Sequence, residues 1–164
     1  MTSLVLLLAL SASDTLVKAS VSDLNLKLPQ SKDWKSSEAD ENNGKSRTVV
    51  SADGDAQIEL SVFAVSPRRE AQKCVDELVK ALGTEGYEAT TVGGSPAFKK
   101  VAVDWVGEGE EAKKNDANKV NTVSYVGCNG RTKWLLSMTS KASKVARFGA
   151  VLKKVIESIT YGGS

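Results

Sequence analysis

The sequence predicts an α+β fold in which an antiparallel β-sheet packs against two amphipathic helices. Two hairpin-type dipeptides, Asp53-Gly54 and Asn129-Gly130, each join segments of alternating apolar and polar residues, which is the pattern of paired strands. Apolar residues recur at intervals of three and four after Pro67 and again over residues 141–158, and this spacing predicts two helices with one buried face each. The 164 residues contain no internal repeat and no linker long enough to divide them, so one domain is expected.

The first predicted strand covers residues 21–28 and ends at Pro29, because leucines alternate there with polar residues. The leucines are Leu24, Leu26 and Leu28. Residues 31–46 are polar and contain Asn43-Gly44, so we expect an irregular turn or a weak hairpin around Trp34.

The Asp53-Gly54 dipeptide predicts a type I′ turn, which requires positive φ at both central residues. Folding the chain about this turn places Val49 opposite Ile58 and Arg47 opposite Leu60. One face of the second strand then points to the core and carries Ile58, Leu60, Val62 and Ala64.

Ser66-Pro67 predicts the start of the first helix, with a serine N-cap and a first-turn proline, and Gly83 predicts its end. Its buried stripe is expected to contain Ala71, Cys74, Val75, Leu78 and Leu82. Strands over residues 87–92 and 97–106 follow, joined by a Gly-Gly-Ser-Pro turn. Residues 107–118 offer almost no apolar side chains, so an exposed and mobile loop is expected there.

The Asn129-Gly130 turn joins predicted strands over residues 120–128 and 131–139. A two-residue turn places Tyr125 opposite Trp134 and Val123 opposite Leu136, so that these four residues share one apolar face. The closing helix has a buried stripe of Val145, Phe148, Gly149, Leu152, Val155, Ile156 and Ile159.

This order of elements resembles the PsbP-type fold, which the PsbP, DcrB and Mog families share. The matching pieces are the Leu-Lys-Leu-Pro strand end with a tryptophan soon after, the strand before the first helix, the stretch from Gly94 to Val106, the Asn129-Gly130 hairpin and the final helix, over about residues 20–160. The resemblance implies an α/β/α sandwich. It also implies a protein that binds or assembles partners and has no catalytic apparatus.

The N-terminus resembles a secretory leader, because an apolar run from Leu4 to Leu10 is followed by small residues. Cleavage after Ser13 or after Ala19 satisfies the small-residue rule. We therefore predict a leader and linker over residues 1–19 and a single PsbP-like domain over residues 20–164, in an exported protein of the periplasm or extracellular space. A cytoplasmic location is the alternative, if the first residues form a buried strand or helix turn. The run is too short to cross a bilayer, which needs about 20 apolar residues.

The composition argues against enzymatic chemistry. The chain contains no histidine, which excludes Ser-His-Asp and Cys-His catalysis and most catalytic zinc sites. Its formal charge of +2 gives no reason to expect nucleic-acid binding. No nucleotide-binding glycine pattern occurs.

Acidic residues form two groups, and neither predicts a site. Asp53 and Asp55 lie in the predicted hairpin turn and lack the pattern of a calcium loop. The other group is solvated, and it contains Glu108, Glu110 and Glu111. No catalytic residue, metal or cofactor is therefore predicted.

Among the aromatic residues, Trp105 and Trp134 are predicted to be core because each shares strand parity with apolar neighbours. Trp34 lies among polar residues, and it is the candidate for a binding groove. The basic outer face of the last helix is interpreted as a solvated face.

Cys74 and Cys128 are the two cysteines of the chain, and in an exported protein they form a candidate disulfide. Cys74 lies on the buried stripe of the first helix, while Cys128 points away from Tyr125 and Trp134. The two sulfurs meet if the first helix covers that second face of the sheet. Two buried thiols in a reducing compartment are the alternative.

The sequence thus favours an exported, non-enzymatic binding or accessory protein of the cell envelope or secreted space, with another protein as its partner. A cytoplasmic adaptor or chaperone of the same fold, binding a GTPase or a secreted effector, is one alternative. A carrier of a lipid or other apolar ligand is a second.

Overall fold

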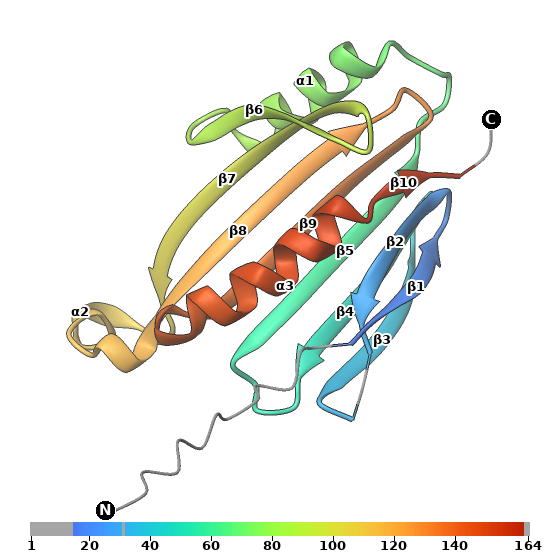
Figure 1. The fold of residues 1–164 in the computed structure, drawn as a ribbon. Coiled ribbons are helices and arrows are strands. Elements are labelled where there is room, and N and C mark those ends of the chain that lie inside the picture. The colour runs from blue at the N-terminus through green and yellow to red at the C-terminus, as the bar shows by residue number, and fades with distance from the viewer. Residues whose placement is uncertain (1–14, 31, 163–164) are drawn as a thin grey trace, which may run out of the picture.

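The computed structural model describes residues 15–30 and 32–162, and Figure 1 shows their arrangement. The strands and helices are β1 (Leu16–Val21), β2 (Leu24–Pro29), β3 (Trp34–Glu41), β4 (Gly44–Ser51), β5 (Ala56–Ala64), α1 (Ala71–Leu82), β6 (Tyr87–Val92), β7 (Ser95–Trp105), α2 (Gly109–Lys113), β8 (Lys119–Cys128), β9 (Thr132–Lys141), α3 (Val145–Glu157) and β10 (Thr160–Tyr161). Short 3-10 turns precede β8 and α3.

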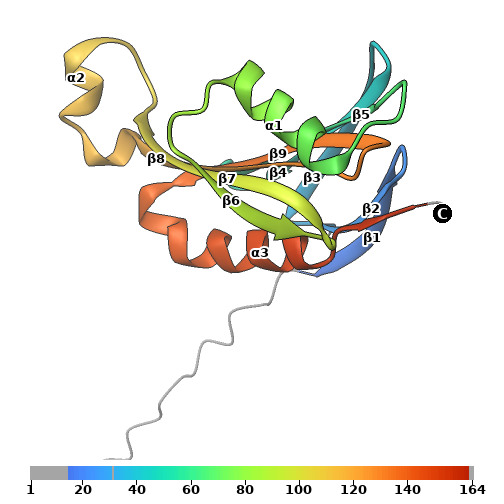
Figure 2. The same cartoon turned by 90° about the horizontal axis from the view of Figure 1, so that it is seen from above.

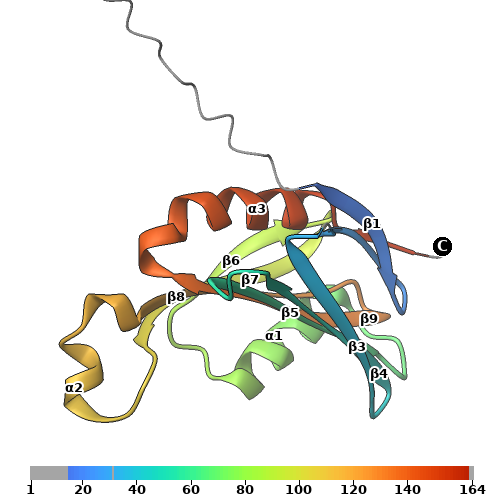
Figure 3. The same ribbon diagram turned by 90° about the horizontal axis from the view of Figure 1, so that it is seen from below.

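The strands form two sheets whose buried faces enclose a common core. A seven-stranded sheet has the order β3-β4-β5-β9-β8-β7-β6, and a three-stranded sheet has the order β1-β2-β10. Helix α1 covers one face of the large sheet, whereas α3 and the small sheet cover the other face (Figures 2 and 3). This layering confirms the predicted α+β class and the packing of one sheet between two helices.

The main core lies between the large sheet, the small sheet and α3. The leucines predicted in the first strand are buried, and they face α3 from β2. The inward residues of β5 and β9 complete the core, together with Phe148, Val151, Leu152 and Val155 of α3. The buried side chain of Trp134 donates its indole N–H to the hydroxyl of Tyr161 at 2.8 Å, which connects β9 to the last strand of the small sheet.

A second, smaller core lies under α1. Cys74, Val75 and Val79 of the helix pack against Val126 and Cys128 of β8. The helix thus covers the face of the sheet that points away from α3, as the disulfide prediction required. Leu82 is exposed, although the predicted stripe included it, because α1 ends beyond the edge of this cluster.

The register of the first hairpin confirms its prediction, since Val49 pairs with Ile58 and Arg47 with Leu60. Of these two turn residues only Gly54 has positive φ, so the connection is a longer turn than type I′. The predicted core face of β5 is buried except at its end, where Ala64 is exposed.

The register of the β8–β9 hairpin differs from the prediction by two residues. Tyr125 pairs with Leu136, and Trp134 pairs with Gly127. The turn is longer because the Asn129 side chain accepts hydrogen bonds from the backbone N–H groups of Arg131 and Thr132. A shift of two preserves strand parity, so the predicted apolar face is correct.

Two other early segments are more regular than expected. The strand predicted over residues 21–28 is a hairpin of β1 and β2, with a turn at Ser22-Asp23 where Ser22 has positive φ. β1 begins at Leu16, four residues before the predicted start of the domain at residue 20. The polar segment predicted as an irregular turn forms the long hairpin of β3 and β4.

Helix α1 begins at Ala71 and not at Pro67. The backbone N–H groups of Val65 and Arg69 donate to the carbonyl oxygens of Arg131 and Gly130. These bonds hold the segment before the helix against the β8–β9 turn, so helical hydrogen bonding starts later than the proline suggested.

The far half of β7 differs most from the sequence-based expectation. Val101 and Val103 are 59% and 49% exposed, and Trp105 is half-buried, whereas the prediction placed Trp105 in the core. Strand β7 lies to the side of α3 and not beneath it (Figure 1), so the apolar side chains of its far half face solvent. The loop predicted over residues 107–118 contains α2 and a 3-10 turn, with Ala112 buried.

Candidate binding surface

An open groove lies between α3 and the end of the large sheet formed by β6, β7 and β8. Its volume is about 410 Å³. We call it the α3–β6 groove, and its lining residues are Thr90, Thr91, Val92, Lys99, Val123, Tyr125, Gly149, Leu152, Lys153, Ile156 and Glu157. The groove exists because α3 packs on β2 and β9, so α3 does not cover this face of the strands nearest the β6 edge.

The floor of the groove is apolar and its rim is charged. Val123 and Tyr125 of β8 and Ile156 of α3 are half-buried. The Lys99 ammonium group lies over the Tyr125 ring, 5.7 Å from its centroid. On the helix side, Lys153 forms an ion pair with Glu157 at 3.8 Å. An apolar floor with a polar rim is the usual composition of a protein-binding patch or a small-ligand site.

Gly149 is the residue that points to binding. It lies inside α3, where glycine destabilises a helix by about 0.5–1 kcal/mol relative to alanine. A Cβ atom added at Gly149 meets no atom within 4 Å, so packing does not require a glycine at this position. Its effect is to keep the helix wall of the groove open.

We expect Gly149→Ala to raise the free energy of unfolding by about 0.5–1 kcal/mol, because alanine restricts the unfolded chain and fits the helix without contact. Urea denaturation measures this change. Gly127→Ala is the matched control and should destabilise, since its Cβ would lie 2.4 Å from the Trp134 ring. A destabilised Gly149→Ala variant would contradict the open geometry of the groove wall.

The exposed valines of β7 continue this surface. Val101 pairs with Val123, which is part of the groove floor, and both side chains point to the face of the sheet that carries α3. Sequence analysis missed this surface, because alternating valines in a strand usually indicate a core face. It also placed Gly149 in the buried stripe, although a glycine inside a helix was a signal in its own right.

Trp34, the residue predicted to line a groove, is in the core. Its side chain is 5% exposed and packs edge-to-face against Phe148 of α3, with ring centroids 5.8 Å apart. The polar neighbours that suggested exposure lie on β3, whose later residues are all exposed. Trp34 therefore supports α3 from below and does not line the α3–β6 groove.

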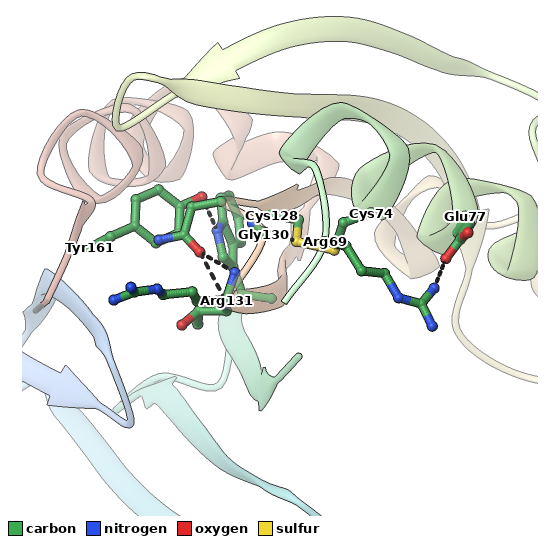
Figure 4. The surroundings of a disulfide bond; sticks show 10 residues. Arg69, Cys74, Glu77, Cys128, Gly130, Arg131 and Tyr161 are labelled. Atoms are coloured by element: carbon green, nitrogen blue, oxygen red, sulfur yellow. Dashed lines mark hydrogen bonds and ion pairs between the residues drawn. A yellow bond between two sulfur atoms is a disulfide. The ribbon is translucent and has the colours of Figure 1, made fainter. Parts of the chain in front are cut away.

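Cys74 and Cys128 form a disulfide, with Cα atoms 6.1 Å apart (Figure 4). The bridge ties α1 to the end of β8. Next to it, the backbone N–H of Gly130 lies 3.3 Å from the Cys128 sulfur, and Arg69 forms an ion pair with Glu77 on the exposed side of the helix. The bridge is buried and on the opposite face of the sheet from the groove, so its role is structural.

Asp53 and Asp55 hold the β4–β5 turn against the start of α3. The Asp53 carboxylate accepts hydrogen bonds from the Ser51 hydroxyl at 2.6 Å and from the Asp55 backbone N–H at 3.1 Å. These two bonds, and to a lesser extent the charges of Arg147 and Lys144, lower the pKa of Asp53 below its ordinary value of 3.8. Asp55 pairs with Lys141, so the two carboxylates are already engaged by the protein.

We expect the stability contributed by Asp53 to depend on pH. Because its pKa is lower in the folded state, the contribution is present above pH 3.8 and is lost as the pH falls through the folded-state pKa. The difference in free energy of unfolding between the wild type and Asp53→Asn should therefore be largest near neutral pH and disappear in stronger acid. Urea denaturation over this pH range measures it, and a difference that is constant with pH would contradict the assignment.

The other acidic group, at α2, is exposed, and two of its three residues pair with lysines one turn away. Glu110 pairs with Lys113 and Glu111 with Lys114. Within the described residues, no cluster of three metal-ligating side chains occurs. Among the same residues, none of the helices has the length and apolar character to cross a membrane.

Comparison with known proteins identifies the fold. No family model matches the sequence, and no curated protein sequence is significantly similar to it. A protein from Bacteroides thetaiotaomicron is similar in structure, with 13% identity and a TM-score of 0.61 over 87% of this chain and 46% of that one. This chain thus spans less than half of that protein.

Two other solved structures match over nearly their whole length. Cyanobacterial PsbP (CyanoP) from Synechocystis sp. PCC 6803 has 11% identity and a TM-score of 0.58, covering 93% of this chain and 95% of that one. The Ran-binding protein Mog1p from Saccharomyces cerevisiae has 12% identity and a TM-score of 0.52, covering 91% and 96%. The chain therefore has a PsbP/Mog1-like fold, as its sequence resemblance implied.

Proposed function

We propose that this protein is an exported, non-enzymatic binding or accessory protein of the cell envelope or secreted space, and that it holds a protein partner in the α3–β6 groove. The observation that carries this proposal is Gly149. Gly149 destabilises α3, although the packing of the helix does not require a glycine at this position. It lies beside the apolar floor of the α3–β6 groove, which is open to solvent.

The fold supports binding as the mode of action. The yeast protein of this fold is a Ran-binding protein, which is an example of a protein partner held by the same architecture. The chain also lacks histidine, and the carboxylates of Asp53, Asp55 and Glu111 form hydrogen bonds or ion pairs within the protein. None of these three carboxylates is therefore a candidate general acid or base.

A comparison of two variants tests the groove. Gly149→Trp should place an indole in the open groove without contacting the helix, so the fold should be kept while partner binding is lost. Ala150→Trp is the matched control, because Ala150 is exposed on the same helix and does not line the groove. A partner captured from the native host by the wild type and by Ala150→Trp should be absent from Gly149→Trp. Equal recovery by all three would overturn the groove as the binding site.

Export is supported by the apolar segment at the N-terminus and by the disulfide, which is typical of oxidising compartments. Of the predicted leader and linker over residues 1–19, residues 1–14 lie outside the described residues. Residues Leu16 to Ala19 belong to β1 and pair with β2, so cleavage after Ala19 would remove most of a strand. We therefore propose cleavage after Ser13. The intact mass of the protein from its native host tests this, and an uncleaved chain would favour the cytoplasmic alternative.

Two alternatives use the same surface. A cytoplasmic adaptor or chaperone would bind a GTPase or a secreted effector in the groove, and its cysteines would be reduced. A carrier would hold a lipid or other apolar ligand, for which a groove of about 410 Å³ is large enough. Native mass spectrometry of the purified protein separates the carrier from the other two, because a carrier retains a small apolar molecule that Gly149→Trp displaces.

A further inference from the structure

The outer face of the small sheet carries two lysines directly opposite each other. Lys18 of β1 pairs with Lys27 of β2, and both side chains are exposed. The other face of β2 is buried, and it carries Leu26 and Leu28. Like charges that face each other across two strands destabilise a sheet. The placement of the two lysines is therefore unfavourable for folding.

The two lysines leave the sheet where facing side chains are nearest. The backbone N–H of Lys27 donates to the Ser158 hydroxyl at 2.7 Å, on the side of β2 that faces β10 and not β1. Lys18 and Lys27 thus form a non-hydrogen-bonded pair, the kind in which side chains are closest. In the next such pair on this face, the Ser20 hydroxyl donates to the Asn25 amide oxygen at 2.5 Å. We therefore expect both ammonium groups to reach one small ligand together.

Contacts within the protein do not account for the pair. The C-terminal end of α3 lies beside Lys27, and the partial negative charge of a helix C-terminus favours one cation. It does not account for a second lysine opposite the first. Among the residues that the structure describes, neither ammonium group forms an ion pair or a hydrogen bond. Both charges are therefore available to a ligand.

A cleft of about 500 Å³ lies over these two lysines. Its polar lining residues are Lys18, Ser20, Asn25, Lys27, Ser158 and Thr160, and none of its described lining residues is acidic. Asn25 pairs with Thr160 of β10. Because the Asn25 amide oxygen already accepts from Ser20, the amide nitrogen is the group that can donate to a ligand, as can the Thr160 hydroxyl.

We propose that this cleft binds a phosphate group between Lys18 and Lys27. A phosphate monoester carries a charge of about −1.5 to −2 at neutral pH and three acceptor oxygens, which matches two ammonium groups with further donors beside them. A carboxylate would neutralise only one of the two lysines. The phosphate belongs to a soluble ester or to a lipid headgroup, and both present the same chemistry to the cleft. The cleft shares no lining residue with the α3–β6 groove, so this inference does not depend on the partner proposed there.

NMR titration of the protein with inorganic phosphate, at constant ionic strength, tests the site. We expect saturable shifts of the amide signals of Lys18, Asn25 and Lys27. Lys18→Gln should weaken binding about tenfold, because a hydrogen bond between charged groups is lost. Lys73→Gln is the control, since it removes the same charge from an exposed lysine of α1 outside the cleft. A wild type without saturable shifts, or equal weakening in the two variants, would overturn the proposal.

Thermal unfolding of Lys18→Glu tests whether the pair is kept at a cost. The substitution replaces a cross-strand repulsion with an attraction, so the variant should be more stable than the wild type when phosphate is absent. It should also lose the stabilisation that phosphate gives to the wild type. A Lys18→Glu variant that is less stable without phosphate would assign the two lysines a structural role and contradict the site.

Vesicle flotation distinguishes the two sources of the phosphate. Phosphatidylcholine vesicles are compared with and without phosphatidic acid, whose headgroup is a phosphate monoester. Binding that requires phosphatidic acid and is lost in Lys18→Gln assigns the cleft to a lipid headgroup. Binding of inorganic phosphate without vesicle binding assigns it to a soluble phosphate ester. A protein that binds neither would overturn the proposal and leave the α3–β6 groove untouched.

Discussion

Replacing Trp34 with alanine is expected to lower the free energy of unfolding by about 3–5 kcal/mol, the range for removing a buried aromatic side chain. Trp34 is 5% exposed, and its ring meets Phe148 edge-to-face. The substitution leaves a cavity between β3 and α3 that neither element can close alone. Because α3 forms one wall of the α3–β6 groove, the variant should also loosen that wall.

Chemical denaturation of the wild type, Trp34→Ala and Trp34→Phe measures this effect. Trp34→Phe keeps an aromatic ring against Phe148 and should lose only part of the stability. A Trp34→Ala variant with nearly native stability and lost partner binding would contradict the core assignment. It would return Trp34 to the binding role that its polar sequence neighbours suggested.

The parts of the fold that the sequence predicted are those determined by short-range chemistry. The Asp53-Gly54 turn places Val49 opposite Ile58 because a turn residue with positive φ fixes where the chain reverses. In the Asn129-Gly130 turn, the asparagine side chain binds two backbone N–H groups and adds two residues to the turn. The predicted register was therefore wrong by two residues. The predicted faces were still correct, because a shift of two leaves each side chain on the same face of the sheet.

The parts that could not be predicted depend on which elements cover which strands. Val101, Val103 and Trp105 alternate as core residues do, yet α3 and the small sheet do not cover their part of β7 (Figure 1). The prediction for Trp34 had the opposite error. Its neighbours on β3 are exposed, but its own ring is covered by α3. Periodicity reports that one face is apolar, and it does not report whether another element lies above that face.

The candidate site was less accessible to sequence analysis than the fold. The α3–β6 groove is formed by residues of three strands and one helix, and it arises from the position of α3 across the sheet. Lys99 and Tyr125 come together only through the pairing of β7 with β8. Gly149 could be noticed from the sequence, because glycine is unfavourable inside a helix. Its role in the groove could be inferred only from the open space that the structure shows beside it.

Removing the disulfide is the other change with a large expected effect. Cys74 and Cys128 are 54 residues apart in sequence, and a cross-link over such a loop stabilises the folded state by about 4 kcal/mol on the chain-entropy estimate, because it restricts the unfolded chain. The double variant Cys74→Ala, Cys128→Ala should lose at least this much stability, since the cross-link is absent and the alanines fill the space between α1 and β8 only in part. Strand parity and the helical stripe predicted that these sulfurs face each other, provided that α1 covers the second face of the sheet, and it does.

Urea denaturation of the oxidised wild type, the reduced wild type and the double variant separates the cross-link from packing. The reduced wild type keeps both sulfurs in the small core, so its loss relative to the oxidised protein measures the cross-link alone. Thiol counting of the unfolded, unreduced protein from its native host should find no free thiol. Two free thiols would contradict the bridge in that compartment, and they would favour the cytoplasmic adaptor over the exported protein, because a buried pair this close oxidises where the surroundings allow it.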